Sequence, residues 1–343
     1  MARANHELLT DLLKGVSRSF YLTLRVLPKA IRPQIGLAYL LARTTDTIAD
    51  TEIVAVEQRL KMLQALRERI LGTSTAPLDF GQLAQQQGLP AERVLLEKCE
   101  ASLALLQAQS ALDQKLIREV LDVITGGQEL DLKRFGNPTP CRIVALQTNA
   151  ELDDYTFRVA GCVGKFWTHI CLAHQFSTEQ TAGPTFEDLG VRFGKGLQLF
   201  NILRDIPSDL AKGRCYIPTE QLTAIGLSPA DLLRPETEPK FRPLYNHYLD
   251  VAESHLAAGW QYTNLIPVGQ MRVRLACAWP ILIGLQTIAR LRVENVLDPR
   301  QRIKINRREV RQMMLRSLVY YPVPYLWRRL ANPKAVAISS FLS

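Results

Sequence analysis

The sequence predicts an all-α protein folded as a single large helical domain. Apolar residues recur with a helical period over nearly the whole chain, and the alternation typical of β-strands is scarce. The joints between the periodic stretches are short and rich in glycine and proline, so none is long enough for a flexible interdomain linker. One domain over residues 1–343 is therefore expected, without internal repeats.

The helices follow in order from the periodic stretches and from the breaks between them. Breaks are expected at Gly72 to Pro77, at Gly126-Gly127, at Asn137 to Pro140 and across the three prolines from Leu233 to Pro243. The expected helices cover residues 5–15, 34–50, 53–72, 91–109, 112–125, 151–174, 186–210, 239–265, 271–293 and 307–319.

Composition and charge favour a globular protein with anionic partners. Of the 343 residues, 47% are hydrophobic and 22% charged, and the formal net charge is +9. Diphosphates, acidic lipid headgroups and nucleic acid all fit this balance, but the arginines match no nucleic-acid reader module, so no nucleic-acid partner is expected. The six cysteines lack metal-ligand spacing, which indicates reduced thiols in a cytoplasmic protein.

The first candidate site lies in the stretch LAYLLARTTDTIAD, residues 37–50. On a helix, Leu37, Leu41, Thr44 and Ile48 form one stripe, whereas Tyr39, Arg43, Asp46 and Asp50 form another. Asp46 and Asp50 project from one face about one turn apart, where like charges repel. A hard divalent cation such as Mg²⁺, which prefers carboxylate and phosphate oxygens, would relieve this repulsion.

A second acidic stripe occurs far along the chain. In the expected helix 186–210, Gln198, Asn201, Asp205 and Asp209 fall within about 80° of arc. Two such stripes facing each other across a helical bundle would hold Mg²⁺ and a diphosphate between them. The alternative is an ordinary solvated face in which Asp46 pairs with Arg43 and Asp209 with Lys212. Residue patterns alone leave both interpretations open.

The motifs resemble those of the squalene/phytoene synthase family, in that family's order and at about its spacings, over roughly residues 10 to 310. They are Ser17-Arg18-Ser19-Phe20, Asp46-Thr47-Ile48-Ala49-Asp50, Tyr155 to Gly164, Asn201-Ile-Leu-Arg-Asp205-Ile-Pro-Ser-Asp209 and Gly213-Arg214-Cys-Tyr216-Ile-Pro218. Any one of them would be weak evidence, but the combination is specific.

The resemblance implies an isoprenoid-synthase helical bundle with a central cavity. It implies Mg²⁺ ligands at Asp46, Asp50, Asn201, Asp205 and Asp209, and diphosphate contacts at Ser17, Arg18, Arg43, Gln198, Asn201 and Arg214. Tyr155 matches the tyrosine implicated in the proton transfer of the first half-reaction. Gly161 and Gly164 indicate close helix packing or room for an isoprenoid tail.

The implied reaction joins two farnesyl diphosphates head to head through presqualene diphosphate. Completion to squalene would use NADPH, for which Lys304 and Arg307 in a basic run are the candidate contacts; an ordinary solvated helix start explains that run nearly as well. There is no GxGxxG fingerprint to support a dinucleotide site. The alternatives are an enzyme that stops at presqualene diphosphate or makes dehydrosqualene or phytoene, and a catalytically silent assembly factor on the same fold.

Three departures from the family pattern bear on these expectations. Ala49 stands where many relatives carry a third acid, and Pro207 removes the helical hydrogen bond to the Leu203 carbonyl. In the segment Arg274 to Pro280, Ala276 replaces an aromatic residue, and Trp279 is expected to fill the gap.

The carboxy-terminal stretch LVYYPVPYLWRRL, residues 318–330, mixes aromatic residues with arginine. This composition favours a membrane interface over a span, so peripheral attachment to the inner face of the membrane is expected, with a tail at about residues 320–343. A last helix packed on the bundle is an equally good interpretation. The amino terminus lacks the apolar run of a secretory peptide, and the longest apolar stretch, Ala276–Leu285, is too short to cross a bilayer.

Overall fold

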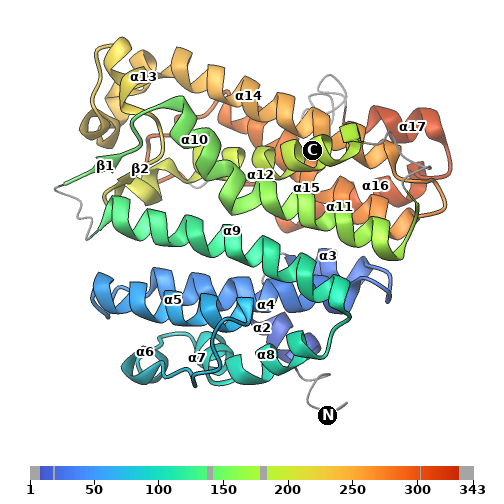
Figure 1. The fold of residues 1–343 in the computed structure, drawn as a ribbon. Helices are drawn as coiled ribbons and strands as arrows, with labels where there is room; N and C mark the ends of the chain where they lie inside the picture. Colours follow the sequence, from blue (N-terminus) through green and yellow to red (C-terminus); the bar gives the residue numbers. More distant parts are fainter. Residues whose placement is uncertain (1–7, 18–19, 137–141, 178–183, 302, 332–343) are drawn as a thin grey trace. The chain divides into compact units, whose positions relative to one another are not determined.

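The regular structure of the chain is almost entirely helical (Figure 1). The computed structural model describes residues 8–17, 20–136, 142–177, 184–301 and 303–331. Within these ranges the strands are the two-residue β1 (Val144–Ala145) and β2 (Arg214–Cys215), which pair in parallel. The all-α prediction is confirmed.

The chain divides into two compact units. One comprises Met1–Asn137 with Phe166–Ser177, and the other comprises Pro138–Lys165 with Thr178–Ser343. Helix α11 (Cys162–His174) contributes residues to both units. The single domain over residues 1–343 and the central cavity stay predictions.

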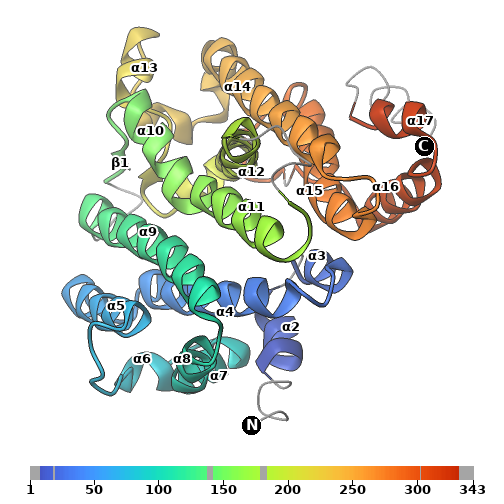
Figure 2. The same ribbon diagram turned by 45° about the vertical axis from the view of Figure 1, so that its right-hand side comes forward.

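The first unit is built on α4, α5 and α9, which pack against one another and lie side by side in Figure 2. Its elements are η1 (Leu8–Leu12), α2 (Leu13–Val16), α3 (Phe20–Val26), α4 (Arg32–Asp50), α5 (Val56–Leu71), α6 (Gly81–Gln85), α7 (Pro90–Glu97), α8 (Cys99–Gln107) and α9 (Ala111–Phe135). Pro33 lies in the first turn of α4, where its missing N–H leaves no bond unmade. The expected apolar stripe Leu37, Leu41 and Ile48 is fully buried, so α4 has the predicted orientation.

The expected break at Gly126-Gly127 is wrong, because α9 continues through both glycines to Phe135. A glycine costs a helix about 1 kcal/mol relative to alanine, and the packing of α9 on α4 and α5 offsets this cost. The stretch 91–109 is also not one helix, since α7 gives way to α8 at Lys98. Helices α3 and α6 fall in stretches for which no helix was expected.

The second unit is centred on α12 and α14, which run together in Figure 1 and make the most extensive packing in the unit. With these two helices, the helical elements of the unit are α10 (Asn149–Thr156), η2 (Phe157–Gly161, a π-helical turn), α12 (Pro184–Leu210), α13 (Thr219–Ala224), the 3₁₀ turns η4 (Pro229–Leu233) and η5 (Pro235–Thr237), α14 (Glu238–Leu265), α15 (Met271–Leu291), α16 (Arg307–Tyr320) and α17 (Pro324–Arg329). The expected helix 151–174 is thus divided by a π-helical turn. Helix α13 was not expected, and α17 agrees with the last helix that was one of the two interpretations of residues 318–330.

Glycines allow the segment around η2 to lie directly on α12. A Cβ atom on Gly164 would come within 1.9 Å of the Gly190 carbonyl oxygen, and one on Gly194 within 2.0 Å of the Ala160 carbonyl oxygen. No side chain fits at either point. Of the two roles expected for Gly164, close helix packing and room for an isoprenoid tail, the structure shows the first. This packing seats the Tyr155 segment against the helix that carries Asp205 and Asp209.

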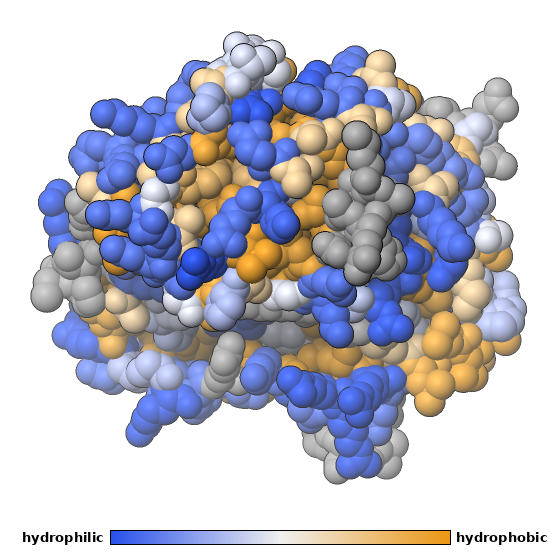
Figure 3. Space-filling model, turned by 90° about the horizontal axis from the view of Figure 1, so that it is seen from below, coloured by the Kyte–Doolittle hydropathy of each residue, from blue (hydrophilic) through white to orange (hydrophobic). Residues whose placement is uncertain are grey.

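On the face seen in Figure 3, hydrophobic residues in orange gather into contiguous areas, in the middle of the view and at its lower right, with hydrophilic residues in blue around them. Five of the six cysteines are described, and all five are buried and outside any disulfide; Cys141 lies outside the described residues. None of the helices in the described ranges is long and apolar enough to cross a bilayer.

Candidate active site

The first acidic stripe lies near the end of α4. Asp50 is the last residue of the helix and is exposed, whereas the Asp46 side chain is half-buried one turn earlier. Because the opposite stripe of α4 is buried in the core, both carboxylates are directed away from it, as the sequence predicted.

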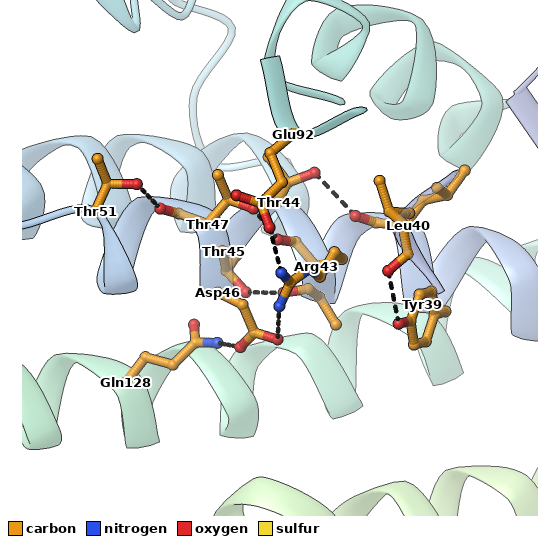
Figure 4. Close-up of polar contacts among 12 residues, drawn as sticks. Tyr39, Leu40, Arg43, Thr44, Thr45, Asp46, Thr47, Thr51, Glu92 and Gln128 are labelled. Atoms are coloured by element: carbon orange, nitrogen blue, oxygen red, sulfur yellow. Dashed lines mark hydrogen bonds and ion pairs between the residues drawn. The ribbon is translucent and has the colours of Figure 1, made fainter. Parts of the chain in front are cut away.

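Two polar side chains, one from α4 and one from α9, contact the Asp46 carboxylate, and a third, from α7, contacts the first of them (Figure 4). The Gln128 amide Nε2 donates a hydrogen bond to Asp46 Oδ1 at 2.5 Å. On the other side, Arg43 Nη1 lies 3.8 Å from Asp46 Oδ2. Arg43 also forms a close ion pair with Glu92 on α7. The expected pairing of Arg43 with Asp46 is therefore present, but Arg43 is shared with a second acid.

The pKa of Asp46 is raised to about 6, first by burial and then by the neighbouring charge of Asp50. Arg43 and the Gln128 amide act in the opposite direction without cancelling the effect. An acid in this state gains from a nearby cation, since a positive charge favours ionisation. Asp46, half-buried beside the exposed Asp50, is therefore an acid whose neighbouring positive charge does not offset its burial.

Ser17 follows α2 in the same unit, and its side chain is only 2% exposed. Its hydroxyl oxygen is buried without a hydrogen-bond partner among the described residues. Arg18 lies outside the described residues, so its expected contact with diphosphate stays a prediction. Tyr39, from the α4 stripe, donates a hydrogen bond to the Val16 carbonyl at 3.4 Å and links α4 to the Ser17 segment.

The second acidic stripe lies on the last three turns of α12. Asp205 forms a bidentate pair with Arg204, at 2.8 Å from Nε and 2.5 Å from Nη2. Gln198 and Asn201 precede it on the same helix and are partly exposed. Within the described part of the chain, neither amide side chain makes a hydrogen bond, so both are available to a ligand.

The pKa of Asp209 is raised to about 7 by burial and by the charge of Asp205. Lys212, Arg214 and Arg204 lower it less than these two effects raise it. Lys212 thus lies close enough to Asp209 to act on it, as the alternative of a surface pair expected, but its charge does not offset the burial of this acid. Arg214 lies in β2 close enough to Asp209 to influence it, so the structure brings these two predicted residues together.

Tyr155 joins the same neighbourhood through its ring. Its centroid lies 4.6 Å from that of Tyr216, the residue that follows β2, with the rings tilted by 30°. Tyr155 is partly exposed, and Tyr216 is buried. Tyr155 thus lies near the end of α12 that carries Asp209 and near β2, which carries Arg214, although it is far from both in sequence.

Both acid pairs fit Mg²⁺ by the chemistry of their donors. In the described ranges, no three Asp, Glu, His or Cys side chains gather into a complete metal cage. Mg²⁺ does not need one, because it usually takes one or two carboxylates together with substrate phosphates and water. In each pair, one carboxylate raises the pKa of the other, a repulsion that a divalent cation would relieve.

The remaining predicted residues lie further along the chain. Lys304 and Arg307 are exposed at the start of α16, where Asn306 and Glu309 form a capping box. The Lys304 carbonyl accepts a hydrogen bond from Arg290. Trp279 is buried and donates from Nε1 to Ser317 Oγ at 3.0 Å, so it joins α15 to α16. Whether it fills the gap left by Ala276 stays a prediction.

Sequence reasoning missed Glu92 and Gln128. Gln128 was overlooked because the helix was expected to end before it, at Gly126-Gly127. A signal for it exists, since Leu121, Thr125, Gln128 and Leu132 repeat at helical spacing, and a glutamine in such a stripe needs a polar partner. No comparable signal marks Glu92, whose partner Arg43 lies 49 residues away.

Comparisons with known proteins agree with these motifs. A family model described as squalene/phytoene synthase matches residues 13–309. The presqualene diphosphate synthase of Zymomonas mobilis is 29% identical over 305 residues, covering 88% of this chain and 90% of that protein. The squalene synthase ERG9 of Saccharomyces cerevisiae is 27% identical over 279 residues, 81% of this chain and 60% of that protein.

A solved structure supports the fold. The complex of TcSQS with the ligand E5700 superposes with a TM-score of 0.74 at 20% sequence identity, covering 98% of both chains. At this identity, the likeness concerns the arrangement of helices alone.

Proposed function

The chain belongs to the squalene/phytoene synthase family, and on this premise we propose that it condenses two farnesyl diphosphates to presqualene diphosphate and completes the reaction to squalene. Head-to-head isoprenoid condensation by a prenyltransferase is the activity of this family. The proposed cofactors are Mg²⁺ and NADPH. The observation that carries the proposal is the pair of recessed acids, Asp46 with a pKa of about 6 and Asp209 with a pKa of about 7, each one turn from a second aspartate.

In this proposal each acidic stripe holds Mg²⁺ against a diphosphate. Bound Mg²⁺ supplies electrostatic neutralisation of the departing diphosphate. The ligands are Asp46 and Asp50 on α4, and Asn201, Asp205 and Asp209 on α12. Arg43 and Arg214 bind diphosphate oxygens, a task that suits the guanidinium fork, and Ser17, Arg18 and Gln198 add polar contacts.

The proposed condensation proceeds by ionisation, attack by a double bond and loss of a proton. The allylic C–O bond of one farnesyl diphosphate breaks, and its electron pair leaves with the diphosphate. The 2,3 double bond of the second molecule attacks the resulting cation, and loss of a proton closes the cyclopropane of presqualene diphosphate. Tyr155 is the group proposed to relay that proton: its phenol oxygen takes the proton up while its own O–H proton passes to the released diphosphate. A neutral phenol can also stabilise the nearby cation without trapping it. Apolar walls exclude the water that would trap the cation as an alcohol.

The second half-reaction distinguishes the candidate products. Loss of the second diphosphate and rearrangement give a cation that becomes squalene when NADPH supplies a hydride. The segment Arg274 to Pro280 and the basic run at Lys304 and Arg307 support this outcome by their likeness to squalene synthases. The competing candidate stops at presqualene diphosphate, or releases dehydrosqualene or phytoene. Ala276 favours it, because an aromatic face that could shield the cation is absent.

Product identification tests the proposal. Purified protein is incubated with farnesyl diphosphate and Mg²⁺, with and without NADPH, and the products are separated and identified. Squalene that forms only with NADPH supports the full proposal. Presqualene diphosphate that accumulates with excess NADPH removes the reductive half and leaves the condensation. No product under any condition would favour the catalytically silent assembly factor, against which the retention of all four aspartates speaks.

Lys304→Ala and Arg307→Ala test the proposed NADPH contacts. Both side chains are exposed, so the substitutions leave the core unchanged. We expect a higher KM for NADPH with an unchanged rate of presqualene diphosphate formation. An unchanged KM in both variants would assign these residues to the solvated start of α16.

The proposed location is the cytoplasmic side of a membrane, with peripheral attachment to the inner face. Two chemical features support it. The farnesyl tail of the substrate and the whole of the product partition into lipid, and the carboxy-terminal helices carry exposed apolar side chains next to arginines.

A further inference from the structure

Helices α16 and α17 expose an unusual concentration of apolar side chains. Leu315, Val319 and Tyr325 are 63%, 62% and 61% exposed. Leu318 and Val323 are also exposed, and these five residues together form what we term the C-terminal apolar patch. The remaining large apolar side chains that are exposed in the described ranges are spread from Ile53 to Val293. Scattered residues need no explanation, but Leu315, Leu318 and Val319 share one face of α16 at spacings of three and four residues. Exposed apolar residues gathered on one face indicate an interaction surface.

Positive charge accompanies this patch. Residues 304–331 contain seven basic residues, Lys304, Arg307, Arg308, Arg311, Arg316, Arg328 and Arg329, and one acid, Glu309. Glu309 is already paired with Arg290. This short segment therefore carries a net charge of +6, which is most of the net charge of +9 of the whole chain. A surface of opposite charge, an anionic one, would complement it.

Two arginines lie against aromatic rings at the patch. The Arg329 guanidinium lies 4.4 Å from the Tyr325 ring centroid, and that of Arg316 lies 5.0 Å from the Tyr320 centroid. Such pairs present an apolar body and a charged head side by side. This combination suits the headgroup level of a bilayer, where one end of a side chain is in lipid and the other in water.

The opposite face of α17 packs against α14 and α15. Trp327 is 2% exposed and donates from Nε1 to Asn264 Oδ1 at 2.9 Å. Its ring stacks on Trp260 at 5.2 Å and meets Tyr321 edge-on at 5.0 Å. The guanidinium of the buried Arg274 lies over both Tyr321 and Trp327, at 5.5 and 5.2 Å, and donates to Asn264 Oδ1 at 3.0 Å.

The packed face and the exposed face of these helices need separate explanations. The aromatic cluster around Trp327 explains why the last helix is ordered, as expected for a helix packed on the bundle. It does not explain the exposed side chains at Leu315, Val319 and Tyr325, which lie outside that cluster. A surface held in place before binding loses little conformational freedom when it binds, which favours association.

We propose that α16 and α17 form a preformed docking surface for a bilayer that contains anionic phospholipids. The apolar patch enters the headgroup region, and the arginines around it bind lipid phosphates. This inference rests on the proposed membrane location and adds the contact surface and the lipid class. An anionic bilayer is preferred to a protein partner because the excess charge surrounds the apolar side chains and has almost no acid within it.

Vesicle sedimentation with the full chain tests the proposal. Wild-type protein is expected to bind vesicles of phosphatidylcholine with phosphatidylglycerol far better than vesicles of phosphatidylcholine alone. The variant Leu315→Ser with Val319→Ser should bind at least about tenfold less tightly to the anionic vesicles. The matched control Ile53→Ser with Leu112→Ser, at residues 58% and 51% exposed, should bind as wild type does.

The variant Arg328→Ser with Arg329→Ser should weaken binding to anionic vesicles and make the remaining binding less sensitive to salt. Equal binding of wild type to both kinds of vesicle would overturn the proposal. An equal loss of vesicle binding in the Ile53 and Leu112 control would also overturn it. So would a Leu315 and Val319 variant that binds vesicles as wild type does but no longer forms an oligomer that wild type forms.

Turnover of farnesyl diphosphate separates this proposal from the proposed function. The docking variants should keep wild-type turnover in vesicle-free buffer, since none of the altered residues belongs to the candidate active site. A protein that forms product but binds no vesicles would refute the docking surface alone. One that binds anionic vesicles through this patch but forms no product would refute the proposed function alone.

Discussion

Tyr245 donates a hydrogen bond from its hydroxyl to the main-chain carbonyl of Leu203, with 3.1 Å between the two oxygens. This is the carbonyl that loses its helical partner because Pro207 has no N–H. Helix α12 continues through Pro207 to Leu210, and α14 supplies the missing donor from a fully buried side chain. The second acidic stripe therefore lies on a helix whose missing main-chain hydrogen bond is replaced by a side chain of α14.

Replacing Tyr245 with phenylalanine should leave the Leu203 carbonyl buried without a donor. We expect a loss of about 1–3 kcal/mol in the free energy of unfolding, measured by urea titration with circular dichroism. In a Pro207→Ala background the restored N–H satisfies the same carbonyl, so Tyr245→Phe should cost clearly less. An equal cost in both backgrounds would contradict this account of the bond.

Asp46→Asn and Asp205→Asn should each reduce turnover by at least about a hundredfold at saturating Mg²⁺ while the helical content stays unchanged. The matched control is Asp188→Asn, which alters an exposed acid elsewhere on α12 and should keep full activity. Wild-type activity in either site variant would remove the metal assignment.

Asp46→Asn should also stabilise the metal-free fold at pH 8. The pKa of Asp46 is about 6 in the folded chain, above its ordinary value, so ionisation in the folded state costs stability as pH rises from about 4 to 6. The neutral amide avoids that cost. Thermal unfolding with a chelator should show a higher midpoint for the variant at pH 8 and no difference near pH 4. A lower midpoint at pH 8 would show that ionised Asp46 is already well compensated by Arg43 and Gln128.

Gln128→Leu should weaken metal binding by about ten- to a hundredfold, because the amide that orients Asp46 is lost. Gln128→Glu should weaken it further or alter its pH dependence, since a second carboxylate would then face Asp46. Mn²⁺ binding followed by electron paramagnetic resonance gives a readout independent of turnover. Gln64→Leu removes a comparable but exposed bond to Glu68 and serves as the control. If both variants bind Mn²⁺ as the control does, Gln128 has no positioning role.

Asp113→Asn should reduce stability at neutral pH by about 1–3 kcal/mol. Burial alone would raise the pKa of Asp113, but hydrogen bonds involving His174, Gln34 and Ser110 outweigh it and lower the pKa below its ordinary value. The stabilisation is therefore complete above pH of about 4 and is lost as pH falls through the folded pKa. Thermal unfolding from pH 3 to 7 should show the two proteins converging only at the acidic end. A difference that stays constant to pH 3 would contradict the charge-based explanation.

The sequence by itself determined the features that depend on local spacing. Helical periodicity predicted the buried stripe of α4 and the polar stripe of α12, because side chains three and four residues apart share a face whatever surrounds the helix. The motif order identified the family for the same reason, since it is written along the chain.

Tertiary structure decided what depends on partners distant in sequence. Gln128 reaches Asp46 across 82 residues, and Tyr245 reaches Leu203 across 42. Packing on α4 and α5 carries α9 through two glycines at which local propensity predicts a break. At α17 the sequence left a packed helix and a membrane surface as alternatives. In the structure, Trp327 is buried and Tyr325 is exposed on one short helix. Which side of the helix is buried depends on the neighbouring helices, and these are formed by distant parts of the sequence.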